Sequence, residues 1–369
     1  MNMRPKINYA GPWITAHEVE AVKEAVQNGF YQNYRVHAKQ LEERLCQFLG
    51  VKHALATNSG TAAIHLAVAA AGIKPRDEVI TTDSSCVASA IPIVYVGATA
   101  VCVDVDPDTW CLSPEAVRKA ITPRTKAILV VHWNGHPAAM DELMVIAREH
   151  DLKVIEDAAP ALGAEYKGRK VGTIGAAGCF SFQGAKVAIG GQGGALVTDD
   201  PKLFEMAGIL ASYGRTDSAR QYWSDYVGFN YTMPNLPAAL AHAQLGRIDE
   251  LVAKKREIWR WYCAGLADFD RVKLIHEAPG TQSTYCYPPM LIGDSVQRTR
   301  EEILAELRKD NIDARPAQPR VSLMPMFQNR FPNPESAKVE ARGVLLPGAF
   351  NVTREDIAFV CQRLREAVK

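Results

Sequence analysis

The alternation of short apolar segments with longer helical segments constrains the fold of this chain more than any other feature. The apolar segments are rich in β-branched residues and cover residues 78–82, 100–105, 126–131 and 153–156. Helical stretches at 61–71 and 140–150 flank them. Parallel strands joined by helical crossovers are the simplest arrangement of such a pattern. The sequence therefore predicts an α/β domain built on a large, mostly parallel sheet.

Helices precede this alternating region, and two further strands complete it. Thr15 and Glu18 have the spacing of a capping box at the start of the first helix. Residues 176–182 and 195–198 predict two more strands around a glycine-rich loop. We therefore expect the first domain, an N-terminal helical segment plus the large α/β unit, to cover residues 1–245.

The character of the chain changes beyond the first domain. Helical patterns cover 251–266, 300–309 and a C-terminal stripe that ends at Val368, strand character covers 280–292, and a proline-punctuated loop covers 316–334. We expect residues 246–369 to form a smaller α+β domain.

Charge and hydropathy exclude several classes of protein. The chain has 42 basic and 41 acidic residues, a formal net charge of +1, and no long run of either sign, so the basic surface of a nucleic-acid-binding protein is not expected. No apolar run approaches the roughly 18 residues of a membrane span, and the N-terminal residues lack the apolar stretch of a signal peptide. The eight cysteines are scattered, without a C-x-x-C pair. We expect a cytoplasmic protein with reduced cysteines and with neither nucleic-acid nor membrane partners.

The motifs for metal ions and nucleotides are incomplete. His132 and His136 stand four residues apart, but in a strand-to-loop passage beside a proline, and no Cys or carboxylate cluster completes a ligand set. No metal site is therefore expected. The glycines at 191–194 break the G-x-G-x-x-G pattern and lead into a strand instead of a helix.

Two segments carry residues suited to binding a charged cofactor. At residues 58–63, Gly60 opens directly into an alanine-rich helix, whose free N–H groups can bind a phosphate; a simple N-cap explains this pattern equally well. The strand at 153–156 leads to Glu156 and Asp157 at the carboxyl edge of the sheet. Asp157 can hold a pyridinium nitrogen protonated, or it can cap the helix that follows.

Two later segments add a candidate nucleophile and a polar loop. Lys186 lies between an apolar strand and a glycine-rich loop, a position that suits an imine-forming amine and also an ordinary surface lysine. Glycines in such a loop let the backbone approach a flat ring closely. Residues 228–236 place polar and aromatic side chains ahead of an alanine-rich helix and indicate little by themselves.

Taken together, the order of these segments closely resembles the DegT/DnrJ/EryC1/StrS family, the sugar and aminocyclitol aminotransferases that use pyridoxal phosphate (PLP) on a fold-type I scaffold. The resemblance extends over nearly the whole chain and includes residues 10–15, 58–61, 156–159, 180–182, 315–316 and 324–327. It implies that Lys186 forms an imine with PLP and later moves a proton as general acid and base. It also implies that Asp157 pairs with the pyridine nitrogen.

The same resemblance implies the remaining cofactor contacts and an oligomeric state. The phosphate would be bound by Gly60, Thr61 and Ala62 at the helix start, by the Ser181 hydroxyl, and by Asn230 of a second subunit. The expected assembly is a homodimer with shared active sites.

The chain departs from the usual residues of the family around the expected site. Cys86 replaces an aromatic residue that stacks on the PLP ring, and we expect Cys86 to contact the cofactor there. Pro160 replaces a Gln or His near the ring hydroxyl. Gln192, Thr232 and Pro237 replace a glutamate, an arginine and a glutamine. These differences indicate intact cofactor chemistry with altered ring and substrate contacts.

The expected reaction is the transfer of an amino group from an amino acid, L-glutamate, to a keto or aldehyde sugar, a nucleotide-linked 4-keto-6-deoxyhexose. The alternative acceptor is a keto-cyclitol or another non-nucleotide carbonyl intermediate of a biosynthetic pathway. A non-catalytic PLP-binding protein is a third interpretation, whereas a dehydratase on the same scaffold would have histidine in place of Lys186. The candidate substrate-binding residues are Gln183, Arg315 and Arg320, with solvated side chains as the alternative for the two arginines.

Overall fold

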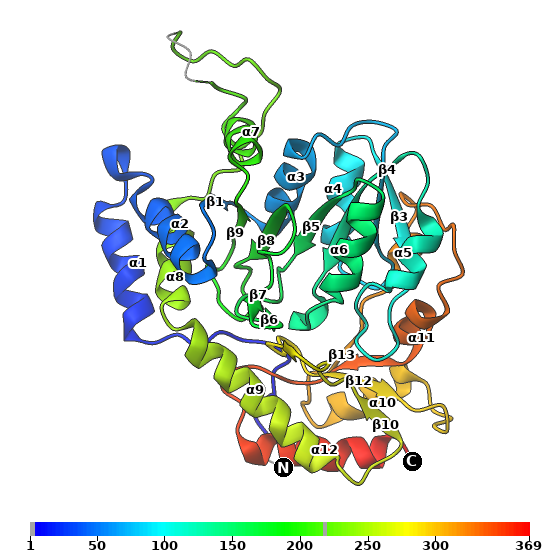
Figure 1. Ribbon diagram of the computed structural model, residues 1–369. Helices are drawn as coiled ribbons and strands as arrows, with labels where there is room; N and C mark the ends of the chain where they lie inside the picture. Colours follow the sequence, from blue (N-terminus) through cyan, green and yellow to red (C-terminus); the bar gives the residue numbers. More distant parts are fainter. Residues whose placement is uncertain (1–3, 217–219) are drawn as a thin grey trace.

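A seven-stranded sheet forms the centre of the computed structural model, which describes residues 4–216 and 220–369 (Figure 1). In spatial order its strands are β1 (His53–Thr57), β9 (Gly194–Thr198), β8 (Ala177–Ser181), β5 (Lys153–Asp157), β4 (Thr125–Val131), β2 (Glu78–Thr82) and β3 (Thr99–Val103). Neighbouring strands from β8 to β3 pair in parallel, whereas β1 and β8 both pair antiparallel with β9, which runs opposite to the other six strands of this sheet. The predicted large, mostly parallel sheet is confirmed.

Helices cover both faces of this sheet, because successive side chains of its strands point to opposite sides. In β4, Ile128 and Val130 pack into one apolar layer, and Leu129 and Val131 pack into the other. The helices of the first layer are α2 (Val36–Leu49), α5 (Pro114–Ala120), α6 (Met140–Glu149) and α8 (Asn235–Leu245). Those of the second layer are α3 (Gly60–Ala70), α4 (Val87–Tyr95) and α7 (Pro201–Ala211). Both layers are needed, since a sheet with parallel strands is buried on its two faces.

The N-terminal helix α1 (Ala16–Asn28) packs against α8 at the β1 edge of the sheet (Figure 1). Its predicted capping box is present: the Glu18 carboxylate accepts from the backbone N–H of Thr15 at 2.7 Å. The short 3-10 turn η1 (Tyr31–Asn33) connects α1 to α2.

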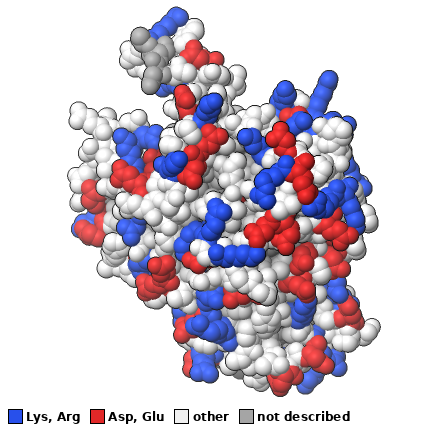
Figure 2. All heavy atoms as spheres, in the orientation of Figure 1, with Lys and Arg blue, Asp and Glu red and all other residues white. Residues whose placement is uncertain are grey.

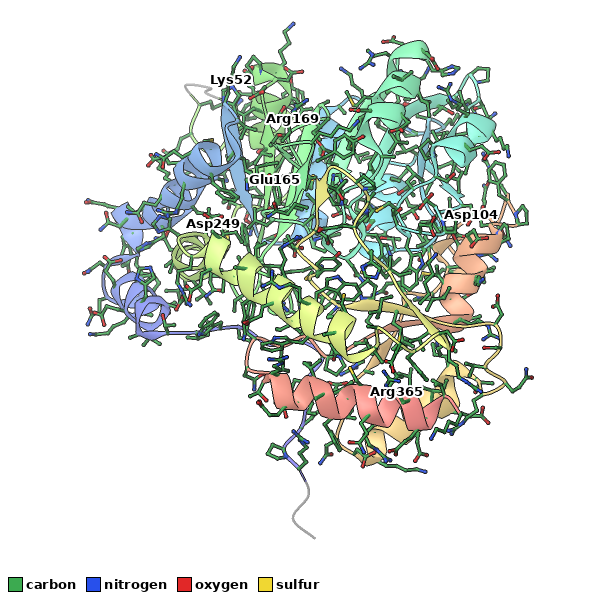
Figure 3. The ribbon with its side chains drawn as sticks, turned by 60° about the horizontal axis from the view of Figure 1, so that its bottom comes forward. Lys52, Asp104, Glu165, Arg169, Asp249 and Arg365 are labelled. Atoms are coloured by element: carbon green, nitrogen blue, oxygen red, sulfur yellow. The ribbon has the colours of Figure 1, made fainter. Side chains whose placement is uncertain are left out.

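A second, antiparallel sheet lies beside the large one. Its strands in order are β10 (Val272–Leu274), β12 (Pro289–Ile292), β14 (Gly343–Leu345) and β13 (Arg315–Pro316). The helices α9 (Ile248–Gly265), α10 (Arg300–Lys309) and α12 (Arg354–Ala367) bury an apolar cluster with it. Figure 3 shows α9 lying above and at an angle to α12, which carries Arg365. The predicted domain boundary at residue 245 falls between α8 and α9 and stays a prediction.

Helix α11 (Pro334–Arg342) joins this part of the chain to the β3 side of the large sheet. The carboxylate of Asp104 accepts from the backbone N–H groups of Glu335 and Ser336 at the start of α11. Figure 3 shows Asp104 beside that helix.

The predicted strand at 280–292 is interrupted. It contains β11 (Thr281–Gln282), which pairs with β6 (Glu165–Tyr166) and through it with β7 (Arg169–Lys170), and then β12 in the other sheet. Between the two strands the Thr284 and Cys286 N–H groups donate to carbonyls of the η2 turn (Trp133–Gly135). These bonds to a different segment replace those of a continuous strand. The predicted loop at 316–334 is irregular apart from η3 (Val321–Leu323).

Charged side chains of both signs are mixed on the face shown in Figure 2, in keeping with the nearly balanced charge of the chain. Among the described residues, no helix has both the length and the apolar character that crossing a membrane requires.

Candidate active site

A pocket of about 390 Å³ opens where several strands of the large sheet end. Asp157 ends β5, Ser181 ends β8, Val131 ends β4, and Ser85 follows β2; all four residues line the pocket. The carboxyl edge of an open α/β sheet is where ligands usually bind. Segments from outside the large sheet also line the pocket and contribute Tyr9, Tyr287 and Gln318.

One end of the pocket has the features of an anion site. Gly60 and Thr61 line it at the start of α3, where the leading N–H groups have no partner within the helix. The Ser181 hydroxyl lies beside them, and a Cβ added at Gly60 would approach the Ser181 Cβ to 2.9 Å. Glycine is therefore required for this close contact. The Ala62 N–H donates instead to the Ser59 side chain at 3.1 Å, and Ala62 does not line the pocket.

Asp157 is a buried carboxylate without a cationic partner. Its side chain lines the pocket in a residue that is 3% exposed. Oδ1 accepts from the Ala159 N–H at 3.0 Å, and Oδ2 accepts from the Ser89 hydroxyl at 2.6 Å. A carboxylate has about four lone-pair sites, so about two remain for a ligand. No described residue forms an ion pair with Asp157.

Lys186 is the cationic side chain of the pocket. It is half-buried in the turn after β8, where its backbone N–H donates to the Gln183 carbonyl at 2.9 Å. Its Nζ makes no hydrogen bond or ion pair within the described chain. It lies over the Tyr287 ring, 5.9 Å from the ring centroid. The amine is therefore available to a ligand in the pocket.

Two stacked tyrosines line the pocket and form an aromatic wall. The rings of Tyr9 and Tyr287 lie 4.6 Å apart, centroid to centroid, and nearly parallel at 17°. Burial raises the pKa of both phenols, so both stay neutral at ordinary pH. Sequence reasoning missed this wall; Tyr9 directly precedes the 10–15 motif, but no spacing signal connects it to Tyr287.

Four more residues singled out from the sequence line the same pocket. Three are departures from the usual residues of the family, and one is a candidate substrate contact. They are Cys86, Pro160, Gln183 and Gln192. Cys86 is an exposed thiol at the N-cap of α4. Its predicted contact with the PLP ring stays a prediction. The Gln183 Oε1 accepts from the Ala185 N–H at 2.9 Å, which fixes the turn before Lys186.

Three other candidate residues lie outside the lining of this pocket. Asn230 is exposed, and its carbonyl accepts from the Asn58 side chain at 2.9 Å. Arg315 is exposed and pairs with Asp313 at 2.6 Å. Arg320 is buried, not solvated: its Nε donates to Asp83 at 2.8 Å, and this pair fastens the 316–334 loop to the end of β2.

Glu156, the neighbour of Asp157, faces away from the pocket into a fully satisfied pair. Its Oε2 lies 2.9 Å from His132 Nε2, and the backbone N–H groups of Gly172, Ile174 and Gly175 complete its hydrogen bonds. Burial by itself raises the pKa of Glu156, but the His132 bond and the backbone donors outweigh it and hold that pKa below its usual range. No cluster suited to a metal ion occurs among residues 4–216 and 220–369.

Comparison with known proteins matches this chain to one family over most of its length. The model of the DegT/DnrJ/EryC1/StrS aminotransferase family matches residues 12–365. The chain is 37% identical to GDP-perosamine synthase of Caulobacter vibrioides over all of both chains, and 34% identical to that of Escherichia coli O157:H7 over 96% of each. Among solved structures, the aminotransferase PseC of Helicobacter pylori superposes with a TM-score of 0.91 at 26% identity, over 99% of each chain.

The side chains of the pocket fit the cofactor of these aminotransferases. Three features of the described chain suit three groups of PLP. The unpaired amine of Lys186 suits the aldehyde, and the buried Asp157 carboxylate, which lacks a counter-charge, suits the ring nitrogen. The helix start beside the Ser181 hydroxyl suits the phosphate. The expected fold-type I scaffold is confirmed. The chain belongs to the DegT/DnrJ/EryC1/StrS family and is a PLP-dependent aminotransferase.

Proposed function

We propose that this enzyme transfers an amino group from L-glutamate to the carbonyl carbon of a keto sugar, a nucleotide-linked 4-keto-6-deoxyhexose. The observation that carries the proposal is the free Lys186 amine in one pocket with the unpaired Asp157 carboxylate. The nucleotide-linked acceptor is supported by relatives named for GDP-perosamine synthesis, which the chain matches over 96–100% of its length.

The residues of the pocket divide the chemistry between them. When bound, PLP withdraws electrons from the substrate carbon and stores the amino group between two half-reactions. We assign proton transfer to and from that carbon to Lys186, whose Nζ is free of other partners. Asp157 holds the proton of the ring nitrogen through its unused lone pairs. Gly60, Thr61 and Ser181 bind the phosphate.

The proposed working form is a cytoplasmic homodimer with shared sites, in which Asn230 serves the phosphate of the partner's cofactor. Exposure of Asn230 on one chain fits this role. Large apolar side chains are also exposed on nearby surface, and such patches mark interaction sites; they include Tyr222, Trp223, Tyr226 and Val227 on the segment that projects from the body in Figure 1. All eight cysteines are free thiols, as expected in a reducing compartment.

A second acceptor class is favoured by one feature of the pocket. Among the described residues that line it, Lys186 is the single cationic side chain; the other polar side chains are neutral apart from Asp157. A diphosphate needs cations from elsewhere, from Arg315 or a partner chain, whereas a keto-cyclitol needs none. The neutral amides of Asn134, Gln183, Gln192 and Gln318 suit the hydroxyls of either acceptor.

The test is single-turnover reaction of the purified pyridoxamine-phosphate enzyme with matched acceptors. Conversion of a nucleotide-linked keto sugar, with kcat/KM at least ten times that for unlinked keto sugars and keto-cyclitols, is the expected result. The reverse order would replace the nucleotide-linked acceptor with the cyclitol. Failure of L-glutamate to regenerate the pyridoxamine form would refute the proposed donor.

A further inference from the structure

Within the part of the chain that the structure describes, Asp157 accepts a hydrogen bond from one side chain, that of Ser89, and both residues line the pocket. Ser89 Oγ donates to Asp157 Oδ2 at 2.6 Å, a short distance typical of a bond to a charged acceptor. Ser89 is 3% exposed and is the third residue of α4, the helix that begins after Cys86. The helix backbone therefore fixes the position of this donor.

A second serine extends the contact and gives it a direction. Ser85 Oγ lies 2.8 Å from Ser89 Oγ, and Ser85 is also 3% exposed. An ionised carboxylate only accepts hydrogen bonds, so Ser89 gives its single proton to Asp157. Ser89 must then accept from Ser85. The resulting hydroxyl relay, Ser85 to Ser89 to Asp157, aims both protons toward the carboxylate.

We propose that Ser89 is a positioning residue that holds the Asp157 carboxylate turned toward the ring nitrogen of PLP, with Ser85 as its support. This inference rests on the proposed function, in which Asp157 pairs with that nitrogen. The Ala159 N–H holds the other oxygen at 3.0 Å, so the two donors together fix the rotation of the carboxylate. The lone pairs that they leave open are those available to a cation in the pocket.

The relay also explains how an uncompensated buried charge is tolerated in the chain. Neutral donors stabilise the carboxylate without supplying a positive charge, so the counter-charge is left for the cofactor to provide. An arginine or lysine in place of Ser89 would satisfy Asp157 fully and would compete with the ring nitrogen.

The experiment measures how tightly the full-length apo-protein binds two ligands at equilibrium. One is PLP, and the other is 1-deazapyridoxal phosphate, in which a C–H group replaces the ring nitrogen. Ser89→Ala should weaken PLP binding roughly three- to tenfold, because the bond to Asp157 already exists without the cofactor and the variant loses the advantage of a carboxylate held in place before binding. It should weaken binding of the deaza analogue less than about threefold. Equal loss for the two ligands, or no loss for PLP, would show that the Ser89–Asp157 bond is merely structural and would overturn the inference.

Three further variants make the result specific. Ser84→Ala is the matched control, because the Ser84 hydroxyl is buried, has no hydrogen-bond partner among the described residues and does not line the pocket; it should change neither affinity. Ser85→Ala should weaken PLP binding less than Ser89→Ala does, and a larger loss would contradict the direction of the relay. Thermal unfolding and circular dichroism check that each variant folds.

Asp157→Asn separates failure of this inference from failure of the proposed function. If Asp157→Asn keeps the wild-type preference for PLP over the deaza analogue, the pairing of Asp157 with the ring nitrogen is wrong. If that variant loses the preference while Ser89→Ala keeps it, the pairing stands and the positioning role of Ser89 is refuted.

Discussion

Lys255 offers a sharp test of how burial controls charge beside the active site. This lysine of α9 is 1% exposed, and its Nζ donates to the carbonyls of Gly348 at 2.6 Å and Cys286 at 3.2 Å. Cys286 precedes Tyr287 of the aromatic wall, and Gly348 donates its N–H to the Tyr9 carbonyl. The amine thus connects the two segments that position the wall, without a carboxylate partner among the described residues.

The pKa of Lys255 sets the size of the effect. Burial lowers this pKa from 10.5 to about 8. Between these values the unfolded chain carries the proton and the folded chain does not, so stability rises with pH in this window and the contribution is absent well below pH 8. At about 1.4 kcal/mol for each pKa unit, the free energy of unfolding should gain roughly 2–3 kcal/mol from Lys255 between pH 7 and pH 10.

Replacement by methionine isolates this contribution, because methionine has a similar length and cannot titrate. Urea unfolding of wild type and Lys255→Met at saturating PLP, from pH 7 to pH 10, measures the difference in free energy of unfolding. Other titrating groups are common to both proteins and cancel. We expect the difference to change by roughly 2–3 kcal/mol in favour of wild type as the pH rises. A difference that stays constant with pH would show that Lys255 keeps its proton despite burial.

The other predictions concern the cofactor site. Lys186→Ala should abolish amino transfer and the covalent attachment of PLP, measured by borohydride reduction and mass spectrometry, with an unchanged melting temperature; near wild-type turnover would contradict the role of Lys186. Mixing Lys186→Ala protomers with Asn230→Ala protomers should restore activity, since each hybrid dimer has both substitutions in one site and none in the other. No recovery despite confirmed subunit exchange would place Asn230 outside the partner's site. Cys86→Tyr should retain PLP about two- to tenfold more tightly in dialysis, because aromatic stacking contributes roughly 0.5–1.5 kcal/mol. Unchanged retention and acceptor preference would show that Cys86 does not face the ring.

The periodic spacing of apolar residues predicted those strands and helices that are determined by their own short stretch of sequence. Strands at 78–82 and 153–156 agree with β2 and β5 almost to the residue, since buried parallel strands are short apolar runs between turns. Strand β1 was missed, because its sequence His-Ala-Leu-Ala-Thr has a single β-branched residue, at its last position. The break in 280–292 was also missed. It depends on carbonyl partners at Asn134 and Gly135, far away in the sequence.

The site residues that could be predicted are those with reactive or ligand-binding side chains, or a free backbone N–H, at the end of a strand or the start of a helix. Asp157, Ser181 and Gly60 lie at such ends and line one pocket, together with Lys186 just after β8. The Ser89 contact was not predictable, because a serine inside an apolar helix has no distinguishing pattern in one sequence. Its role depends on the placement of α4 over the end of β5.

Three buried carboxylates near strand ends show why the sequence alone could not assign their roles. Asp83 accepts from Arg320, from Asn333 and twice from Ser322, with three of these bonds at Oδ2 and one at Oδ1, and it thereby anchors a loop. Glu156 accepts four bonds from His132 and three backbone groups. Asp157 accepts two, from neutral donors. Since about four lone-pair sites are available on each carboxylate, and a buried charge left short of partners is costly, Asp83 and Glu156 use their acceptor capacity on donors of the described chain, whereas Asp157 keeps acceptor capacity for a ligand in the pocket.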